Sequence, residues 1–229
     1  MKHLFLALAL SSIGILSQSS RPAQKVAPPA PLPTPISMPP DRAADSYQIY
    51  SQLLEHGQIE GTTWDRTFWL VEEATTSERP DVPCFPDGQK SNNFGMNPHS
   101  AIQAPSDRAK DLKALLDDYD LHCHERIQLK RDSFQVQLPI RLADDDTKKN
   151  FFATHLGPTQ PGPKLKAEFE GAAGIHSFSE VYFTPNHDLA MVSTGVWCGG
   201  LCGEWRWVVL ERNGGRWTPL NWVHTFVVS

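Results

Sequence analysis

The C-terminal third of the chain contains four strand-like runs: SFSEVYF (177–183), LAMVSTGVW (189–197), EWRWVVLER (204–212) and RWTPL (216–220). They have the length and the β-branched and aromatic content of β-strands. The segments that separate them are short and contain turn residues, as in Asn213-Gly214-Gly215. Because short turns of this kind join antiparallel neighbours, we expect a β-meander of successive hairpins, with residues 222–228 as its last strand.

Upstream of the meander, helical and extended spacings alternate along the chain. Apolar residues three and four apart predict helices over residues 45–57, 107–119 and 144–156. Residues 67–71 have strand composition, and strict alternation over residues 134–142 predicts a further strand, which Pro139 restricts to a sheet edge or a bulge. Residues 76–106 show no periodicity and are expected to form a loop. We therefore predict an α+β fold, with short helices packed on a mainly antiparallel sheet that ends in the C-terminal β-meander.

The N-terminus has the pattern of a cleavable signal peptide. Lys2 precedes an apolar stretch over residues 4–16, and the small residues at 17–19 predict cleavage after Ser19. The apolar stretch is shorter than the roughly 20 residues of a membrane-spanning helix, and no later segment is apolar for that long. No cysteine lies near the cleavage position, so a diacylated start is not expected. We predict that residues 1–19 are removed and that the mature protein is soluble and secreted or periplasmic.

A proline-rich segment follows the predicted signal peptide. Eight prolines lie between Pro22 and Pro40, interleaved with small residues. Proline fixes φ and removes a hydrogen-bond donor, so such a segment stays extended. We predict that residues 20–44 are a linker to one globular domain, residues 45–229. A tail without a spacer role is the alternative.

Charge and motifs limit the classes of function. The formal net charge is -5, and basic residues occur in pairs such as Lys130-Arg131, without a run of five. We therefore expect no binding of DNA or RNA. The chain lacks the Gly-x-Ser-x-Gly and His-Glu-x-x-His motifs of known enzyme classes. We expect a non-enzymatic domain without a cofactor.

The four cysteines all lie in the predicted mature part. An even number of cysteines in an exported chain favours disulfides over free thiols. Cys198 and Cys202 flank a tight turn and are expected to form one bridge, which leaves Cys84 to pair with Cys123.

A metal-dependent or thiol-dependent exported enzyme is the alternative from another class. Cys198 and Cys202 would supply half of a zinc site, and Cys123 with His122 or His124 would supply the other half. The stretch His122-Cys123-His124-Glu125 also places a thiol beside a base, and His176 lies elsewhere in the chain. Adjacent residues rarely face one another, which favours a disulfide cysteine flanked by surface histidines.

Trp205 and Trp207 are the candidate binding residues. They alternate with Arg206 and Val208, so the two sets point to opposite faces of the sheet, and both faces are apolar there. Either helices cover both faces, or one face leaves indole rings exposed to stack on a sugar or on a partner's side chain. A cell-envelope glycan or protein is therefore the expected partner.

The turn Trp197-Cys198-Gly199-Gly200-Leu201-Cys202-Gly203 precedes a strand, a Gly-Gly turn and Trp217. This arrangement resembles a group of uncharacterised bacterial exported proteins that share a Cys-Gly-x-Leu-Cys-Gly-like turn in a terminal hairpin. The run 178–183 also resembles that group, while the turn here contains an additional glycine. The resemblance implies export and a terminal β-meander. The group has no established activity, so it implies no catalytic residues.

Overall fold

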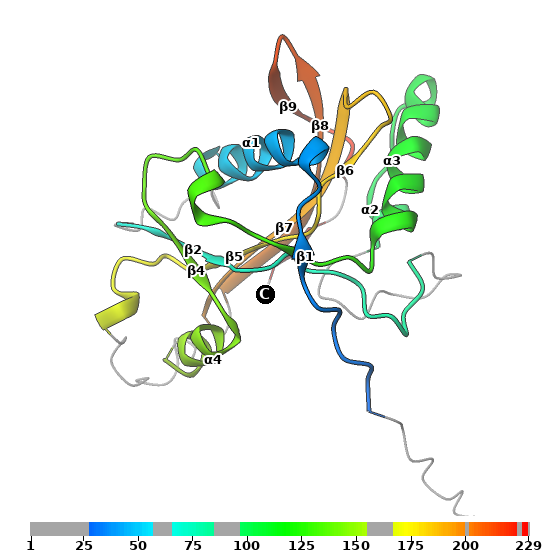
Figure 1. Cartoon of the computed structure of the whole chain (residues 1–229). Helices are drawn as coiled ribbons and strands as arrows, with labels where there is room; N and C mark the ends of the chain where they lie inside the picture. Colours follow the sequence, from blue (N-terminus) through cyan, green and yellow to red (C-terminus); the bar gives the residue numbers. More distant parts are fainter. Residues whose placement is uncertain are drawn as a thin grey trace, which may run out of the picture.

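The computed structural model describes residues 28–56, 66–84, 97–154, 167–199, 202–223 and 226–228 (Figure 1). The predicted signal peptide and residues 20–27 of the predicted linker lie outside these ranges. The described helices are α1 (Pro40–His56), α2 (Pro98–Ala101), α3 (Ala109–His122) and α4 (Asp145–Thr154), with short 3-10 turns η1 (Ser106–Arg108), η2 (Arg131–Ser133) and η3 (Ala167–Phe169). Within the described residues, no helix combines the length and apolar character needed to cross a membrane.

The main sheet has eight strands in the order β10-β8-β7-β5-β2-β4, with β6 beside β7 and β9 beside β8. Its strands are β2 (Trp69–Glu72), β4 (Ile140–Ala143), β5 (Ile175–Phe178), β6 (Tyr182–Phe183), β7 (Leu189–Gly199), β8 (Cys202–Asn213), β9 (Arg216–Leu220) and β10 (Phe226–Val228). The β2–β4 and β2–β5 pairs are parallel, whereas the other pairs of this sheet are antiparallel. The predicted α+β fold with a mainly antiparallel sheet is confirmed.

Helices cover both faces of the long β7–β8 hairpin. Val208 of β8 lies in a buried cluster with Tyr50 of α1. Trp207 is the preceding residue and points to the opposite face, where it lies in a second cluster with Leu115 of α3. Figure 1 shows α1 and α3 on the two sides of these strands. At residues 207 and 208, helices therefore cover both faces, which is one of the two arrangements that the alternating pattern allowed.

The predicted third helix is confirmed as α4 in its described part. The carboxylate of Asp144 accepts a hydrogen bond from the backbone N–H of Thr147 at 2.7 Å and so caps the helix. Phe151 of α4 is fully buried in a third cluster, together with Leu70 of β2 and with Phe68, which precedes that strand. Burial of one such aromatic side chain is worth about 2–3 kcal/mol, so this short helix is held mainly by packing.

The strand predicted over residues 134–142 is wrong in its first part, because only Ile140–Ala143 form β4. The preceding segment crosses α1 instead of pairing in the sheet. The N–H of Gln135 donates to Ser51 Oγ at 2.8 Å, and the N–H of Gln137 donates to Glu55 Oε1 at 2.6 Å. Side chains of a helix thus satisfy backbone donors that a neighbouring strand would otherwise take. Pro139, which has no N–H, separates this segment from β4.

Helix α1 begins at Pro40, earlier than the predicted start at Asp45. A proline suits the first helical position, because its N–H would have no helical partner there. Arg42 in the first turn contacts Asp118 at 2.5 Å and Glu180 at 2.8 Å. Just before the helix, β1 (Ile36–Ser37) pairs in parallel with β3 (Ile127–Gln128). The last part of the predicted linker is therefore integrated into the folded domain.

The C-terminal strands follow the prediction with two differences. The run 177–183 is interrupted after β5, where Ser179 Oγ accepts a hydrogen bond from the N–H of Ser193 at 2.8 Å. The last strand, β10, pairs with the start of β8 and not with β9, so the arrangement is not a simple meander. The predicted β8–β9 turn is confirmed: Gly214 and Gly215 have φ of 57° and 80°, as a tight hairpin turn requires.

Candidate functional site

The register of β5, β7 and β8 collects polar residues at one end of an otherwise apolar sheet face. His176, Val196 and Glu204 are aligned across the three strands, and Phe178, Thr194 and Arg206 form the adjacent row. Cross-strand partners share a face. Phe178 packs against Tyr50 of α1, with ring centroids 4.7 Å apart. The two rows therefore lie on the face that α1 covers.

A pocket of about 390 Å³ lies where the C-terminal end of α1 approaches β8. Residues that line it include Gln52, His56, Arg206, Val208, Leu220 and Asn221. Strand pairing explains its position. β9 pairs with Val209–Asn213 and β10 with Glu204–Arg206, so the two strands leave a gap along β8 at residues 207–208. The pocket opens beside this gap.

An ion pair lies at the polar end of this face. The Nε atom of Arg206 is 3.3 Å from Glu204 Oε1, and both side chains are partly buried. The two residues are two positions apart on one strand and therefore point to the same face. In this partly water-excluded position, the pair offers a cation and an anion to a bound molecule.

His176 sits deeper on the same face, beside β2. The His176 ring packs edge-on against the Trp69 ring, with the ring centroids 5.1 Å apart. The Arg66 guanidinium lies over the Trp69 ring, 3.7 Å from its centroid. The His176 side chain is partly exposed as a whole, but its Nε2 atom is buried without a hydrogen-bond partner in the described part of the chain. Burial, assisted by the nearby Arg66 charge, lowers the pKa of His176 to about 3. The imidazole is therefore neutral at ordinary pH.

The low pKa of His176 predicts an acid-sensitive stability. The unfolded chain takes up a proton near the ordinary histidine pKa of about 6.5, whereas the folded chain resists it until about pH 3. Between these values the unfolded state binds more protons, so the free energy of unfolding falls as pH falls. We expect the free energy of unfolding of His176→Gln, measured by urea unfolding from pH 7.5 to 4, to fall less steeply with falling pH than that of the wild type. Parallel curves for the two proteins would contradict this.

The two tryptophans predicted to bind a partner have different environments. Trp207 is only 8% exposed, and its ring contacts Tyr119 edge-on at 5.7 Å. Trp205 is half-buried, and a Cβ at Gly195 would lie 2.3 Å from its ring, so glycine leaves room for the indole. Both rings point to the α3 face, opposite the polar rows. Trp207 thus belongs to the core and is also one of the residues that line the pocket, whereas Trp205 does not line it.

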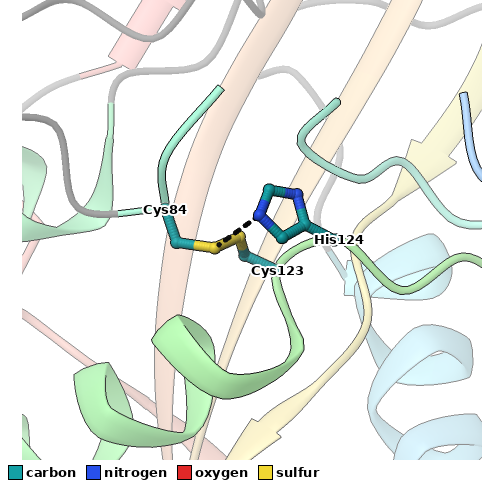
Figure 2. A group of neighbouring side chains, drawn as sticks. All are labelled: Cys84, Cys123 and His124. Atoms are coloured by element: carbon teal, nitrogen blue, oxygen red, sulfur yellow. Dashed lines mark hydrogen bonds between the residues drawn. A yellow bond between two sulfur atoms is a disulfide. The ribbon is translucent and has the colours of Figure 1, made fainter. Parts of the chain in front are cut away.

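The structure contains both predicted disulfides, Cys84–Cys123 and Cys198–Cys202. Figure 2 shows the first, with His124 Nε2 at 3.4 Å from Cys84 Sγ. Cys123 caps α3, whereas Cys198 lies near the tip of the β7–β8 hairpin. Each sulfur is bonded within its own pair, so in this state the cysteines offer no thiolates for a zinc site or a nucleophile.

Sequence reasoning missed the polar end of the sheet face and the pocket beside it. One signal was present: Arg206 is a charged residue between two tryptophans in an otherwise apolar strand. Alternation assigns Arg206 to the face opposite the indoles. Nothing local indicates that α1 ends close to it, or that β9 and β10 leave a gap there.

No family model, curated protein or solved structure matches this chain. The likeness of its C-terminal strands to exported bacterial proteins therefore stays a prediction. Its function has to be inferred from its own residues.

Proposed function

We propose that this protein is an exported, non-enzymatic binding domain whose ligand site is the pocket at the C-terminal end of α1. The observation that carries the proposal is the composition of that pocket. Its volume of about 390 Å³ lies in the range typical of small-molecule sites, which are mostly apolar with a few polar groups. Two disulfides support an oxidising compartment outside the cytoplasm.

The residues around the pocket indicate the chemistry of its ligand. Leu220 and Val208 offer apolar surface, and Gln52 and Asn221 offer amide donors and acceptors. Arg206, which is paired with Glu204, adds a cation at the wall, and guanidinium groups bind carboxylates. A carboxylated sugar of the cell envelope combines an apolar ring face, hydroxyls and a negative charge. We infer a ligand of this class.

Calorimetry with two matched sugars tests the proposal. N-acetylmuramic acid carries a carboxylate, whereas N-acetylglucosamine has the same ring without it. We expect the acid to bind about tenfold or more tightly than the neutral sugar, which corresponds to about 1.4 kcal/mol. Arg206→Gln should remove this preference, because it keeps hydrogen-bonding capacity but loses the charge.

Arg216→Gln is the matched control, because Arg216 is an exposed arginine on the neighbouring strand β9 and does not line the pocket. Its preference for the acid should equal that of the wild type. The proposed ligand class would be refuted if neither sugar bound the protein. It would also be refuted if Arg206→Gln and Arg216→Gln lost the preference for the acid equally.

A further inference from the structure

A second polar cluster lies at the opposite end of α1 from the pocket, where α3 ends. Ligand atoms of His122, Glu125 and Glu180 all lie within 4.8 Å of one another. His122 is the last residue of α3, Glu125 follows it, and Glu180 lies in the segment between β5 and β6. The end of α3 and the segment between β5 and β6 thus bring one imidazole and two carboxylates together.

The carboxylate of Glu180 is the most informative group of this cluster. Its side chain is 3% exposed, and Oε1 accepts a hydrogen bond from Arg42 at 2.8 Å. The other oxygen, Oε2, is buried and has no hydrogen-bond partner among the described residues. A buried acceptor without a partner costs about 1–3 kcal/mol. A ligand that contacts Oε2 would remove this cost.

Neighbouring groups hold His122 in a geometry that suits a metal ligand. His122 Nδ1 is 3.0 Å from Glu125 Oε1, and its Nε2 is 3.6 Å from Asp118 Oδ1. Asp118 is itself fixed, because it accepts hydrogen bonds from Arg42 at 2.5 Å and from the N–H of Phe183 at 2.8 Å. Histidines that bind metals typically direct the second ring nitrogen at a carboxylate, which fixes the tautomer. Asp118 lies on that side of the His122 ring, at a distance beyond that of a direct hydrogen bond.

The charges of the cluster also favour a divalent cation. The Arg42 guanidinium contacts the carboxylates of Asp118 and Glu180, and Glu125 adds a third carboxylate to the cluster. The cluster is also accessible, because the side chains of His122 and Glu125 are 24% and 35% exposed.

We propose that His122, Glu125 and Glu180 bind a divalent transition-metal ion, for which Zn²⁺ is the best match. Imidazole and carboxylate are both zinc ligands, whereas Mg²⁺ and Ca²⁺ prefer oxygen alone. Three protein ligands leave a fourth position for water. The ion would link the end of α3 to the segment between β5 and β6, independently of the pocket and of its ligand.

The neighbouring group Cys84, Cys123 and His124 is the competing site. Its two sulfurs are bonded to each other (Figure 2). It would therefore need a reductant before it could bind a metal as thiolates. The two candidate sites share no residue, so single substitutions separate them.

Zinc calorimetry on the tag-free, oxidised protein tests this site. We expect one Zn²⁺ per chain, with at least about tenfold weaker binding in His122→Gln and in Glu125→Gln. Both residues are partly exposed, so these variants should remain folded, which circular dichroism checks. His124→Gln is the control and should bind Zn²⁺ as the wild type does. Ca²⁺ in place of Zn²⁺ should bind at least about tenfold more weakly.

Three outcomes would overturn the assignment. The first is no stoichiometric Zn²⁺ binding at about 100 µM metal, roughly a hundredfold above a micromolar Kd. The second is wild-type affinity in both cluster variants, and the third is a loss of affinity confined to His124→Gln. None of them bears on the sugar titration, and Arg206→Gln should leave Zn²⁺ binding unchanged. Failure of one proposal is therefore distinguishable from failure of the other.

Discussion

Trp207→Ala is expected to lower the free energy of unfolding by about 3–5 kcal/mol, the cost of removing a large aromatic side chain from a core. The indole is 8% exposed and contacts the rings of Tyr119 and Tyr182. Neither the tyrosines nor the strands can move far enough to fill the space, because α3 and β7 also pack there. Urea unfolding monitored by circular dichroism measures the change.

Trp205→Ala is the matched control two residues away on the same face. Trp205 is half-buried, so we expect a loss of roughly 1–2 kcal/mol, in proportion to the smaller area it removes from water. If Trp207→Ala fails to fold, Trp207→Phe gives a milder comparison and should still cost more than Trp205→Phe. Equal decreases in the free energy of unfolding at the two positions would contradict the difference in burial between Trp205 and Trp207.

Removal of the Cys84–Cys123 disulfide is expected to lower the free energy of unfolding by about 4 kcal/mol, because the bridge closes a long loop of the unfolded chain. The two cysteines are 39 residues apart in sequence, whereas Cys198 and Cys202 are 4 apart. The same loop-entropy relation gives only about 2 kcal/mol for the shorter bridge. Removal of the Cys84–Cys123 bridge should therefore lower the free energy of unfolding about twice as much as removal of the Cys198–Cys202 bridge.

Double alanine variants of each pair, unfolded in urea under oxidising conditions, provide the measurement. Alanine avoids placing hydroxyls at Cys84 and Cys123, which are both buried. A larger loss for the hairpin pair than for Cys84–Cys123 would contradict the entropic explanation. It would mean that native contacts around Cys198 contribute more than chain entropy does.

The sequence predicted well those features that depend on neighbouring residues. β9 has the predicted bounds, because the Asn-Gly-Gly turn and the flanking apolar residues define a hairpin locally. The disulfide pairing followed from the tight turn between Cys198 and Cys202, which left one other combination. α4 followed from the Asp144 cap and the apolar spacing after it.

Features that depend on distant parts of the chain could not be predicted in the same way. Residues 134–139 alternate like a strand, but Ser51 and Glu55 of α1 take the hydrogen bonds that a strand would have made. The choice of β8 over β9 as the partner of β10 likewise involves no local signal. The pocket and the His122–Glu125–Glu180 cluster both depend on such long-range pairing, so neither was visible as a motif.

The pairing of β1 with β3 determines where the chain enters the folded domain. The Ile36 N–H donates to the Arg126 carbonyl at 2.8 Å, so the chain enters the domain at a fixed position beside the start of α1. Arg42 and His56 are separated along that helix by about 20 Å, at 1.5 Å per residue. The pocket therefore lies at the far end of the helix from this point of entry. If the protein were held by its N-terminus, the length of α1 would separate the pocket from the point of attachment.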